Sequence, residues 1–186
     1  MESKLKFLTI GYIEWRKGQD LLIDTLELIS DDYLGDSEFG FVGQDSSVMA
    51  KSLKERIQGN QNIKMLGTVS RDEIHRLLEE TDVLICPSRE DPMPTVCAEA
   101  MMHGVPCIVS DATGTSAYIS DGYNGLVFKS EDIDALKGKI LWCINHRSEL
   151  AKMGDKARIV YEETFSIDVF ERKLLSYVDD MINKKE

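Results

Sequence analysis

Short apolar runs alternate with longer amphipathic stretches along most of the chain. The runs are rich in Val, Ile and Phe, which is typical of strands buried on both faces of a parallel sheet. They predict strands at residues 4–10, 39–42, 63–66, 83–86, 107–109 and 126–128. The stretches between them predict helices at residues 18–29, 46–57, 71–80 and 94–103, and a helical turn at 115–119. This alternation predicts an α/β fold with a doubly wound, parallel, six-stranded sheet.

The remainder of the chain is helical in pattern. Its predicted helices lie at residues 132–145, 147–164 and 168–182. Ser130 and Ser166 precede acidic residues that favour a helix start, and Ser70 with Glu73 forms a capping box. One domain is predicted over residues 1–186, with residues 166–186 as a C-terminal helix. Core packing is the simplest expectation for the apolar face of that helix, which comprises Phe170, Leu174, Tyr177, Val178 and Met181.

Length and charge exclude several classes of protein. A chain of 186 residues suits one globular domain with a real core. Its 33 acidic and 22 basic residues give a net charge of −11, the wrong sign for nonspecific binding to nucleic acid or to an anionic membrane. The sequence lacks an apolar tract of about eighteen residues that would span a membrane, and its N-terminus lacks the apolar segment of a signal peptide. We therefore expect a cytoplasmic location.

The cysteines and histidines offer no clear metal or disulfide chemistry. Cys86, Cys97, Cys107 and Cys143 stand in apolar surroundings without a C-x-x-C pair, and the three histidines are widely scattered. The pattern predicts reduced thiols packed in the core, with neither a zinc site nor a disulfide framework.

The loop after the first strand is the first candidate for chemistry. The strand ends at Gly11, and Arg16 and Lys17 follow just before Gly18. Two adjacent cations at the carboxyl edge of a central strand can bind phosphate, Lys as a point charge and Arg as a bidentate fork. On these residues alone a solvated loop is the simpler explanation, because the G-x-G-x-x-G fingerprint of dinucleotide-binding folds is missing.

The helix predicted at residues 94–103 is the more informative candidate. Pro94 suits the first helical position and Gly104 the residue just past the end. The amino end of this helix then lies at the carboxyl edge of the sheet. The backbone N–H groups of Thr95 and Val96 lack acceptors within the helix, so with the helix dipole they predict an anion site that suits a diphosphate.

Two carboxylates flank this helix start. Asp91 lies in the loop before it, and Glu99 lies in its second turn with a side chain that tilts toward the amino end. Both can accept hydrogen bonds from the hydroxyls of a sugar or a ribose. Taken singly, Glu99 also suits a solvent-facing helix position and Asp91 a turn before Pro92.

Residues 87–106 resemble the signature of the family 4 retaining glycosyltransferases of GT-B fold. The signature has the form Pro-Ser-x-x-Glu-x-Phe-Gly/Pro-x-x-x-x-Glu-Ala-Met-x-x-Gly-x-Pro, and Asp91 and Glu99 occupy its two acidic places. Similarity continues in order along nearly the whole chain, at Gly11 with Lys17 and Gly18, at Gly43, at residues 66–70 and at the Asp-Gly-Tyr-Asn-Gly-Leu turn of residues 121–126.

The resemblance implies that the chain is the carboxyl-terminal, Rossmann-like half of such an enzyme, which binds the nucleotide sugar. The N-terminal half, which would bind most of the acceptor, is then missing, and any peripheral membrane association would run through it. The resemblance also suggests that the apolar face of the last helix crosses back toward that half. The implied reaction is sugar transfer with retention of configuration through an oxocarbenium-like transition state. The nucleotide sugar is the implied substrate, and neither a metal nor another cofactor is expected.

The resemblance also implies roles for individual residues. Gly11 belongs to the first phosphate loop, where Lys17, aided by Arg16, binds the diphosphate. Thr95 and Val96 supply backbone N–H groups to it. Glu99 holds the ribose, and Asp91 is the catalytic residue that contacts the transferring sugar. Backbone at Met93 and Pro94 lies nearby, and Thr68 and Val69 line the base pocket.

Departures from the family pattern keep other hypotheses open. Tyr12 stands where the family usually has Arg, Asp91 where Glu is commoner, and Ala117 where an acid is usual. A degenerate, non-catalytic module that binds a sugar nucleotide or another protein is the alternative. A nicotinamide-dependent oxidoreductase is disfavoured by the missing glycine fingerprint. Tyr12 and Trp15 can stack on a ligand, although packing against the missing half explains them more simply.

Overall fold

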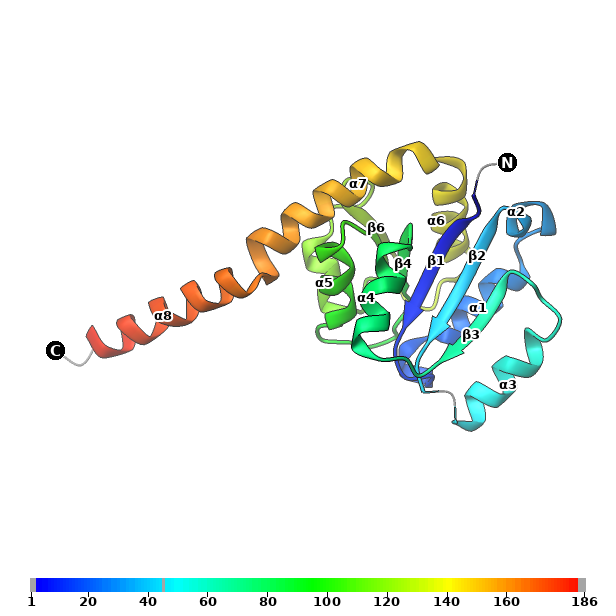
Figure 1. Cartoon of the computed structure of the whole chain (residues 1–186), viewed down its shortest axis with the longest axis horizontal. Helices are drawn as coiled ribbons and strands as arrows, with labels where there is room; N and C mark the ends of the chain where they lie inside the picture. Colours follow the sequence, from blue (N-terminus) through cyan, green and yellow to red (C-terminus); the bar gives the residue numbers. More distant parts are fainter. Residues whose placement is uncertain (1–2, 45, 184–186) are drawn as a thin grey trace.

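The computed structural model describes residues 3–44 and 46–183. Its six parallel strands are β1 (Leu5–Ile10), β2 (Ser37–Val42), β3 (Ile63–Gly67), β4 (Val83–Cys86), β5 (Cys107–Ser110) and β6 (Gly125–Phe128). They lie in the order β3-β2-β1-β4-β5-β6, so the winding reverses between β1 and β4 (Figure 1). The predicted doubly wound sheet is confirmed. Both ends of the predicted domain 1–186, residues 1–2 and 184–186, lie outside the described residues.

Helices connect the strands and continue the chain after β6. The α-helices are α1 (Gln19–Glu27), α2 (Asp31–Gly35), α3 (Val48–Arg56), α4 (Arg71–Glu79), α5 (Thr95–Met102), α6 (Ile133–Asn145), α7 (Arg147–Val160) and α8 (Ile167–Asn183). Two short 3₁₀ turns, η1 (Trp15–Lys17) and η2 (Gly114–Tyr118), and one π-helical turn, η3 (Tyr161–Phe165), complete the described elements.

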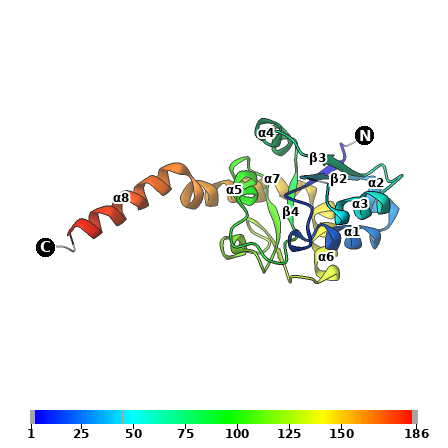
Figure 2. The same cartoon turned by 90° about the horizontal axis from the view of Figure 1, so that it is seen from below.

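Hydrophobic side chains cover both faces of the sheet, as near-continuous apolar strands require. Phe7 faces the helices α1, α3 and α6, and its ring stacks on that of Phe39 with the centroids 4.6 Å apart. The next residue, Leu8, faces the opposite side, where α4, α5 and α7 pack. Figure 2 shows α4 on one side of β2 and β3 with α1 and α3 on the other. Each face therefore has its own buried core.

The register brings three loops to one edge of the sheet. Ile10 pairs with Val42, so β1 and β2 end side by side. The Gly11 N–H then donates to the Val42 carbonyl oxygen and the Gly43 N–H to the Gly67 carbonyl oxygen, both at 2.9 Å. The loops after β1, β2 and β3 consequently start at the same carboxyl edge, where ligands of such sheets bind.

Most elements begin and end near their predicted positions, and the differences have local causes. The five-residue helix α2 is not predicted, because one turn is too short to show periodicity. Pro94 is extended, with φ −68° and ψ 104°, so it is the N-cap of α5 and not its first residue. Asp132, not Ser130, caps α6. The helix predicted to Thr164 ends at Val160, because the chain widens into η3, where the Ser166 N–H donates to the Tyr161 carbonyl oxygen at 2.9 Å.

The N-cap of α6 makes a testable contribution to stability. The Asp132 carboxylate accepts a hydrogen bond from the Ala135 N–H at 2.9 Å. We expect Asp132→Ala to lower the free energy of unfolding by about 1 kcal/mol, because the first turn then loses its acceptor. Asp132→Asn keeps an acceptor and should lose much less. Urea unfolding followed by circular dichroism measures both variants, and equal losses would contradict the cap.

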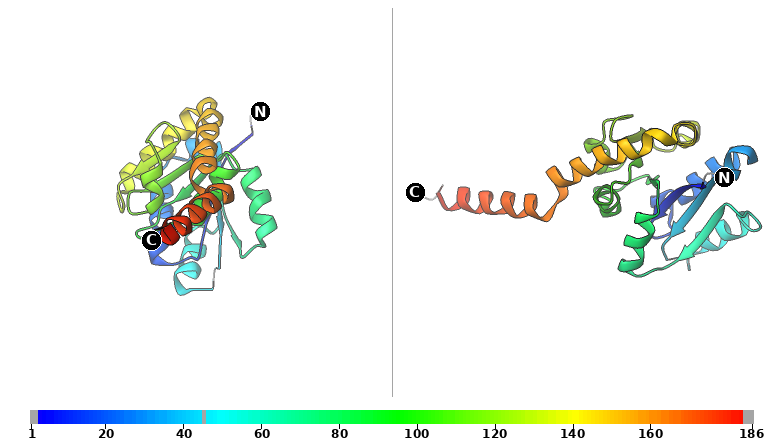
Figure 3. Two further views of the ribbon diagram at one scale, coloured as in Figure 1. Left: turned by 90° about the vertical axis from the view of Figure 1, so that its left-hand side faces the viewer. Right: turned by 45° about the horizontal axis from the view of Figure 1, so that its top comes forward.

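The expectation of core packing for the apolar face of α8 is wrong. This helix extends away from the sheet (Figures 1 and 3). Ser166 starts it as predicted, with its hydroxyl accepting from the Val169 N–H at 3.4 Å, and Val169 is buried. The remaining apolar side chains are exposed: Phe170, Leu174, Tyr177, Val178 and Met181. Within the described residues, none of the helices has the length and apolar character needed to cross a membrane.

Candidate functional site

Two loops from neighbouring strands meet at the carboxyl edge. The loop of residues 11–18 follows β1, and the loop of residues 87–94 follows β4. The Arg89 N–H donates to the Arg16 carbonyl oxygen at 2.8 Å. Gly18 has φ +70°, and a Cβ atom built there would lie 2.0 Å from the Pro87 carbonyl oxygen. The reversal of winding between β1 and β4 therefore brings both loops into direct backbone contact.

The charged side chains predicted for these loops form an ion pair. Lys17 Nζ lies 2.5 Å from Asp91 Oδ2, and the side chains are 19% and 8% exposed. The stem of Lys17 passes over Gly11, since a Cβ atom there would lie 3.7 Å from Lys17 Cδ. The structure thus brings Gly11, Lys17 and Asp91 together, although Gly11 and Asp91 are 80 residues apart in the sequence.

Backbone contacts hold Asp91 in place. Its N–H donates to the Ala112 carbonyl oxygen at 3.4 Å, and its carbonyl oxygen accepts from the Gly114 N–H at 2.9 Å. Asp91 also forms a parallel bridge with Thr113. The loop after β5 therefore supports the loop after β4, although the sequence pattern gives no sign of this pairing.

Helix α5 begins at Thr95, four residues after Asp91 of the ion pair. The Cys97 N–H donates to the Pro94 carbonyl oxygen at 3.0 Å. The N–H groups of Thr95 and Val96 therefore precede the first hydrogen bond of the helix and are available to an anion. Met93, before the N-cap, is 43% exposed. Glu99 is partly exposed in the second turn, and its predicted contact with a ribose stays a prediction.

A pocket of about 230 Å³ opens beside this site, at the ends of β1, β2 and β3. Its lining includes Gly11, Tyr12, Gly43, Gln44, Thr68 and Val69. Thr68 and Val69, predicted to line a base pocket, thus share one cavity with Gly11, which is predicted to belong to a phosphate loop. Because Lys17 packs over Gly11, the pocket and the ion pair are neighbours.

Arg16 is engaged differently from Lys17. Its guanidinium donates to Glu14 Oε1 at 3.0 Å and to the Glu90 carbonyl oxygen at 3.3 Å. Its positive charge is therefore already shared with a carboxylate. The prediction that Arg16 assists in phosphate binding stays a prediction.

Two further residues of the site are not predicted from the sequence. The buried Gln19 donates from Nε2 to the Tyr12 carbonyl oxygen at 2.9 Å and so fixes the start of the first loop. Arg89 reaches Trp15, Asp20 and Glu131. No sequence pattern predicts the role of Arg89, because its partners lie up to 74 residues away. For Gln19, the only indication in the sequence is its position at the start of a predicted helix.

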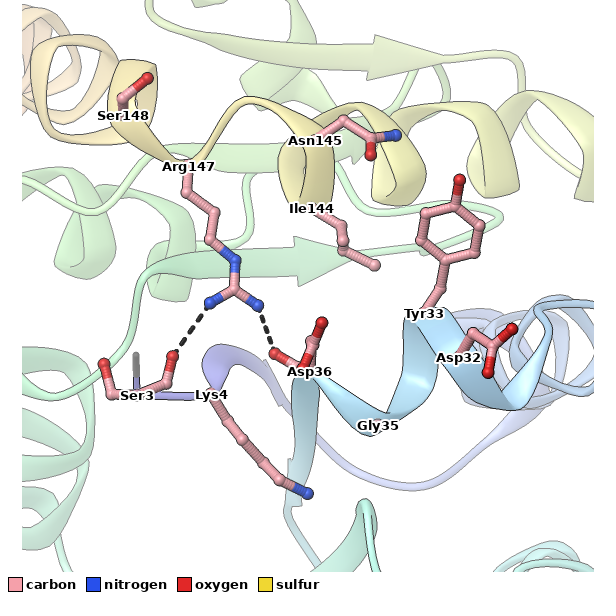
Figure 4. A pocket seen from close by; sticks show the side chains of 10 residues that line it. All are labelled: Ser3, Lys4, Asp32, Tyr33, Gly35, Asp36, Ile144, Asn145, Arg147 and Ser148. Carbon is pink, nitrogen blue, oxygen red and sulfur yellow. Dashed lines mark hydrogen bonds between the residues drawn. The ribbon is translucent and has the colours of Figure 1, made fainter. Parts of the chain in front are cut away.

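A larger hollow, of about 800 Å³, lies at the opposite, amino edge of the sheet. Figure 4 shows Arg147 inside it, donating to the main-chain oxygens of Ser3 and Asp36. These bonds tie the start of α7 to the chain before β1 and β2. The Arg147 guanidinium therefore has a structural role. The hollow lies far from the two loops that contain the predicted binding and catalytic residues.

A histidine pair links α4 to the end of α5 and makes stability depend on pH. His75 Nδ1 lies 2.9 Å from His103 Nε2. Burial lowers the pKa of His103, with further lowering by His75 and Arg158 that Glu79 and Glu99 partly oppose. The folded state therefore binds this proton less readily than the unfolded state, whose histidine pKa is about 6.5. The stability that neutral His103 contributes is present above that pH and is lost as the pH falls.

We expect His103→Gln to flatten this pH dependence. The free energy of unfolding of the natural chain should fall between about pH 7.5 and 5.5, and the variant should fall less over the same interval. Urea unfolding at several pH values measures the slope. Parallel slopes for the two proteins would contradict the role of His103.

The four thiols are buried and free, as predicted. Burial raises the pKa of Cys143 to about 12, and hydrogen bonding to Cys97 together with burial raises the pKa of Cys86. These thiols are therefore unreactive core side chains. Among the described residues, no group of three or more His, Cys, Asp and Glu side chains is arranged to hold a metal ion.

Comparison with known proteins identifies the family. The model of the family "Glycosyl transferases group 1" matches residues 1–160. The chain belongs to this family. A glycosyltransferase of Methanocaldococcus jannaschii is 30% identical over 152 residues, which cover 81% of the chain and 41% of that protein. An Escherichia coli UDP-Gal:α-D-GlcNAc-diphosphoundecaprenol α-1,3-galactosyltransferase is 33% identical over 112 residues, covering 58% of the chain and 28% of that protein.

Solved structures of other proteins share the fold. The Anabaena protein Alr3699/HepE in complex with UDP and glucose superposes with a TM-score of 0.84 at 20% identity, over 96% of the chain and 49% of that structure. Sucrose-phosphate synthase from Thermosynechococcus elongatus gives 0.85 at 18% identity, over 97% of the chain and 46% of that structure. The predicted Rossmann-like half of a GT-B fold is confirmed. The chain spans less than half the length of these relatives.

Proposed function

We propose that this chain is the nucleotide-sugar-binding half of a retaining glycosyltransferase. The observation that carries the proposal is the Lys17–Asp91 pair, set between the open N-terminus of α5 and the pocket lined by Gly11 and Thr68. A diphosphate suits the helix start and the cation, a base suits the adjacent pocket, and a carboxylate suits sugar hydroxyls. The acceptor is proposed to bind the part of the relatives that this chain does not span.

The ion pair suggests how the sugar donor is received. Lys17 forms an ion pair with Asp91 in the structure. An incoming diphosphate competes for the Lys17 ammonium, because it carries more negative charge and the N–H groups of Thr95 and Val96 add to its binding. Asp91 is then free to accept hydrogen bonds from the transferring sugar, as proposed for its catalytic role. Without Lys17 between them, the carboxylate and the diphosphate would repel each other.

The same groups account for the proposed chemistry. When the glycosidic bond to the diphosphate breaks, negative charge grows on the leaving oxygen and positive charge on the sugar ring. Lys17 and the helix start stabilise the leaving diphosphate, and the Asp91 carboxylate stabilises the oxocarbenium-like sugar. Glu99 is proposed to hold the ribose. In this proposal the cation and the helix end take the place of a divalent metal.

Support for a uridine nucleotide comes from the relatives. Alr3699/HepE is described in complex with UDP and with UDP-glucose, and the E. coli relative is named for a UDP-galactose donor. Isothermal titration calorimetry of the chain with UDP, GDP, ADP and their sugars tests the proposal. Binding of at least one nucleotide in a Lys17-dependent manner is expected. Failure of the whole panel to bind at millimolar concentration would overturn the proposal and favour the non-catalytic interaction module.

A transfer assay separates sugar-donor binding from catalysis. We expect the 186-residue chain alone to bind nucleotide without sugar transfer, because the acceptor side of the cleft belongs to the half that it does not span. Release of UDP from UDP-sugar in the presence of acceptor sugars measures turnover. Transfer by the isolated chain would contradict this division of labour.

A further inference from the structure

Arg89 has more partners than any other side chain near the two loops. Its Nη1 donates to the Trp15 carbonyl oxygen at 2.6 Å and to Asp20 Oδ1 at 2.8 Å, and its Nη2 donates to Asp20 Oδ2 at 2.9 Å. Its Nε donates to Glu131 Oε1 at 2.9 Å. The guanidinium carbon lies 4.8 Å from the centre of the Trp15 ring. The side chain is only 11% exposed, and the two carboxylates raise its pKa, chiefly through Asp20.

These contacts join three segments at the carboxyl edge. Trp15 belongs to the turn η1, Asp20 to the first turn of α1, and Glu131 to the chain before α6. Glu131 has φ +63°, a backbone conformation that non-glycine residues rarely adopt. The Arg89 N–H also donates to the Arg16 carbonyl oxygen. Residue 89 therefore holds η1 through both its backbone and its side chain.

The placement of Arg89 matters because the Lys17–Asp91 pair spans the same two loops. Lys17 is the last residue of η1, and Asp91 lies two residues after Arg89. A shift of η1 against the loop of residues 87–91 would separate Lys17 from Asp91 and from the start of α5. The guanidinium directs four hydrogen bonds to protein groups, so it has little capacity left for a ligand.

We propose that Arg89 is a positioning residue that locks the Lys17-bearing turn onto the loop carrying Asp91. It acts through Lys17 and does not touch the substrate. This inference rests on the proposed function for its effect on nucleotide binding, but its effect on the turn is independent of any ligand.

A double-mutant cycle on nucleotide binding tests the inference. We expect Arg89→Met to weaken UDP binding roughly tenfold in the natural chain and to have almost no effect in the Lys17→Met background, because Arg89 acts through Lys17. Arg89→Lys should restore only part of the affinity, since an ammonium cannot bind Asp20 in bidentate fashion. Equal losses in both backgrounds would overturn the inference and indicate a general structural role.

Arg56 provides a matched control. It also forms ion pairs with two carboxylates, Asp24 and Glu27, but it joins α3 to α1 away from the two loops. We expect Arg56→Met to lower stability while UDP affinity stays unchanged. A loss of affinity comparable to that of Arg89→Met would show that any disruption near α1 suffices, and would overturn the inference.

A fluorescence measurement tests the turn without a ligand. In a Trp142→Phe background, Trp15 is the only tryptophan, and this residue is 62% exposed. At temperatures below the unfolding transition, we expect Arg89→Met to raise the acrylamide quenching of Trp15 fluorescence and to lower its anisotropy. Arg56→Met is the control and should change neither signal. Unchanged Trp15 signals in Arg89→Met would overturn the inference. If the natural chain binds no nucleotide while Trp15 responds as expected, the proposed function fails and the positioning role stands.

Discussion

Lys17→Met is expected to weaken nucleoside diphosphate binding by about tenfold to a hundredfold, since a hydrogen bond to a charged group contributes about 1.5–3 kcal/mol. The side chain of Met has a similar length but no charge. The variant also leaves Asp91, which is 8% exposed, close to the incoming diphosphate without a cation between them. The dissociation constant for UDP, measured by titration calorimetry, is the readout.

Variants of Asp91 separate this binding effect from a loss of folding. Lys17→Met alone should also lower the free energy of unfolding, because a largely buried carboxylate loses its partner. The double variant Lys17→Met with Asp91→Asn removes both charges and should recover stability without recovering affinity. Asp91→Asn alone keeps the cation and should bind UDP at least as tightly as the natural chain. If Asp91→Asn instead lost affinity as severely as Lys17→Met, the cation would not be the phosphate ligand.

The sequence predicts the sheet well because burial on both faces leaves a strong local signal. Val83–Cys86 and Cys107–Ser110 are buried at every position, and apart from Ser110 their residues form the continuous apolar runs that are typical of inner strands. The one-turn helix α2 shows the limit of this signal. Five residues do not complete two turns, so no periodicity develops and the segment is typical of a loop.

The exposed face of α8 shows a second limit. Phe170, Leu174 and Tyr177 recur at helical spacing, which predicts that one face is buried but does not say against what. Among the side chains of α8 that the structure describes, only that of Val169, near the start of the helix, is buried. An amphipathic pattern thus identifies a face that needs a partner, and the partner can lie outside the chain. The part of the relatives that the chain does not span is our proposal for it.

Some residues of the candidate site can likewise be predicted from the sequence, and others cannot. Lys17 and Asp91 are predictable because each lies in the loop that follows a strand, and parallel strands bring such loops to one edge of the sheet. The role of Arg89 is not predictable from the sequence, because it depends on hydrogen bonds to Trp15 and Asp20, which lie about 70 residues away along the chain. Few side-chain types suit the binding of phosphates and sugars, whereas almost any polar residue can hold those side chains in place.

Gly114→Ala is expected to destabilise the protein strongly, because the added methyl group meets backbone atoms of the loop that carries Asp91. A Cβ atom at Gly114 would lie 1.8 Å from the Pro92 carbonyl oxygen and 2.8 Å from the Pro92 carbonyl carbon. Both atoms are backbone, so neither can rotate away. The Gly114 N–H also donates to the Asp91 carbonyl oxygen at 2.9 Å. The methyl group must therefore push the loop of residues 91–93 away from η2, at a cost of about 2–3 kcal/mol.

Gly138→Ala is the matched control, because a Cβ atom there meets nothing within 4 Å and the residue lies inside α6. The same methyl group should raise the free energy of unfolding by about 0.5–1 kcal/mol, since Ala favours a helix more than Gly does. Urea unfolding measures both. Because the displaced loop carries Asp91, Gly114→Ala should also weaken binding of a UDP-sugar more than binding of UDP. A Gly114→Ala protein as stable as the natural chain would show that the two loops are not in the contact described, and Asp91 would then need another support.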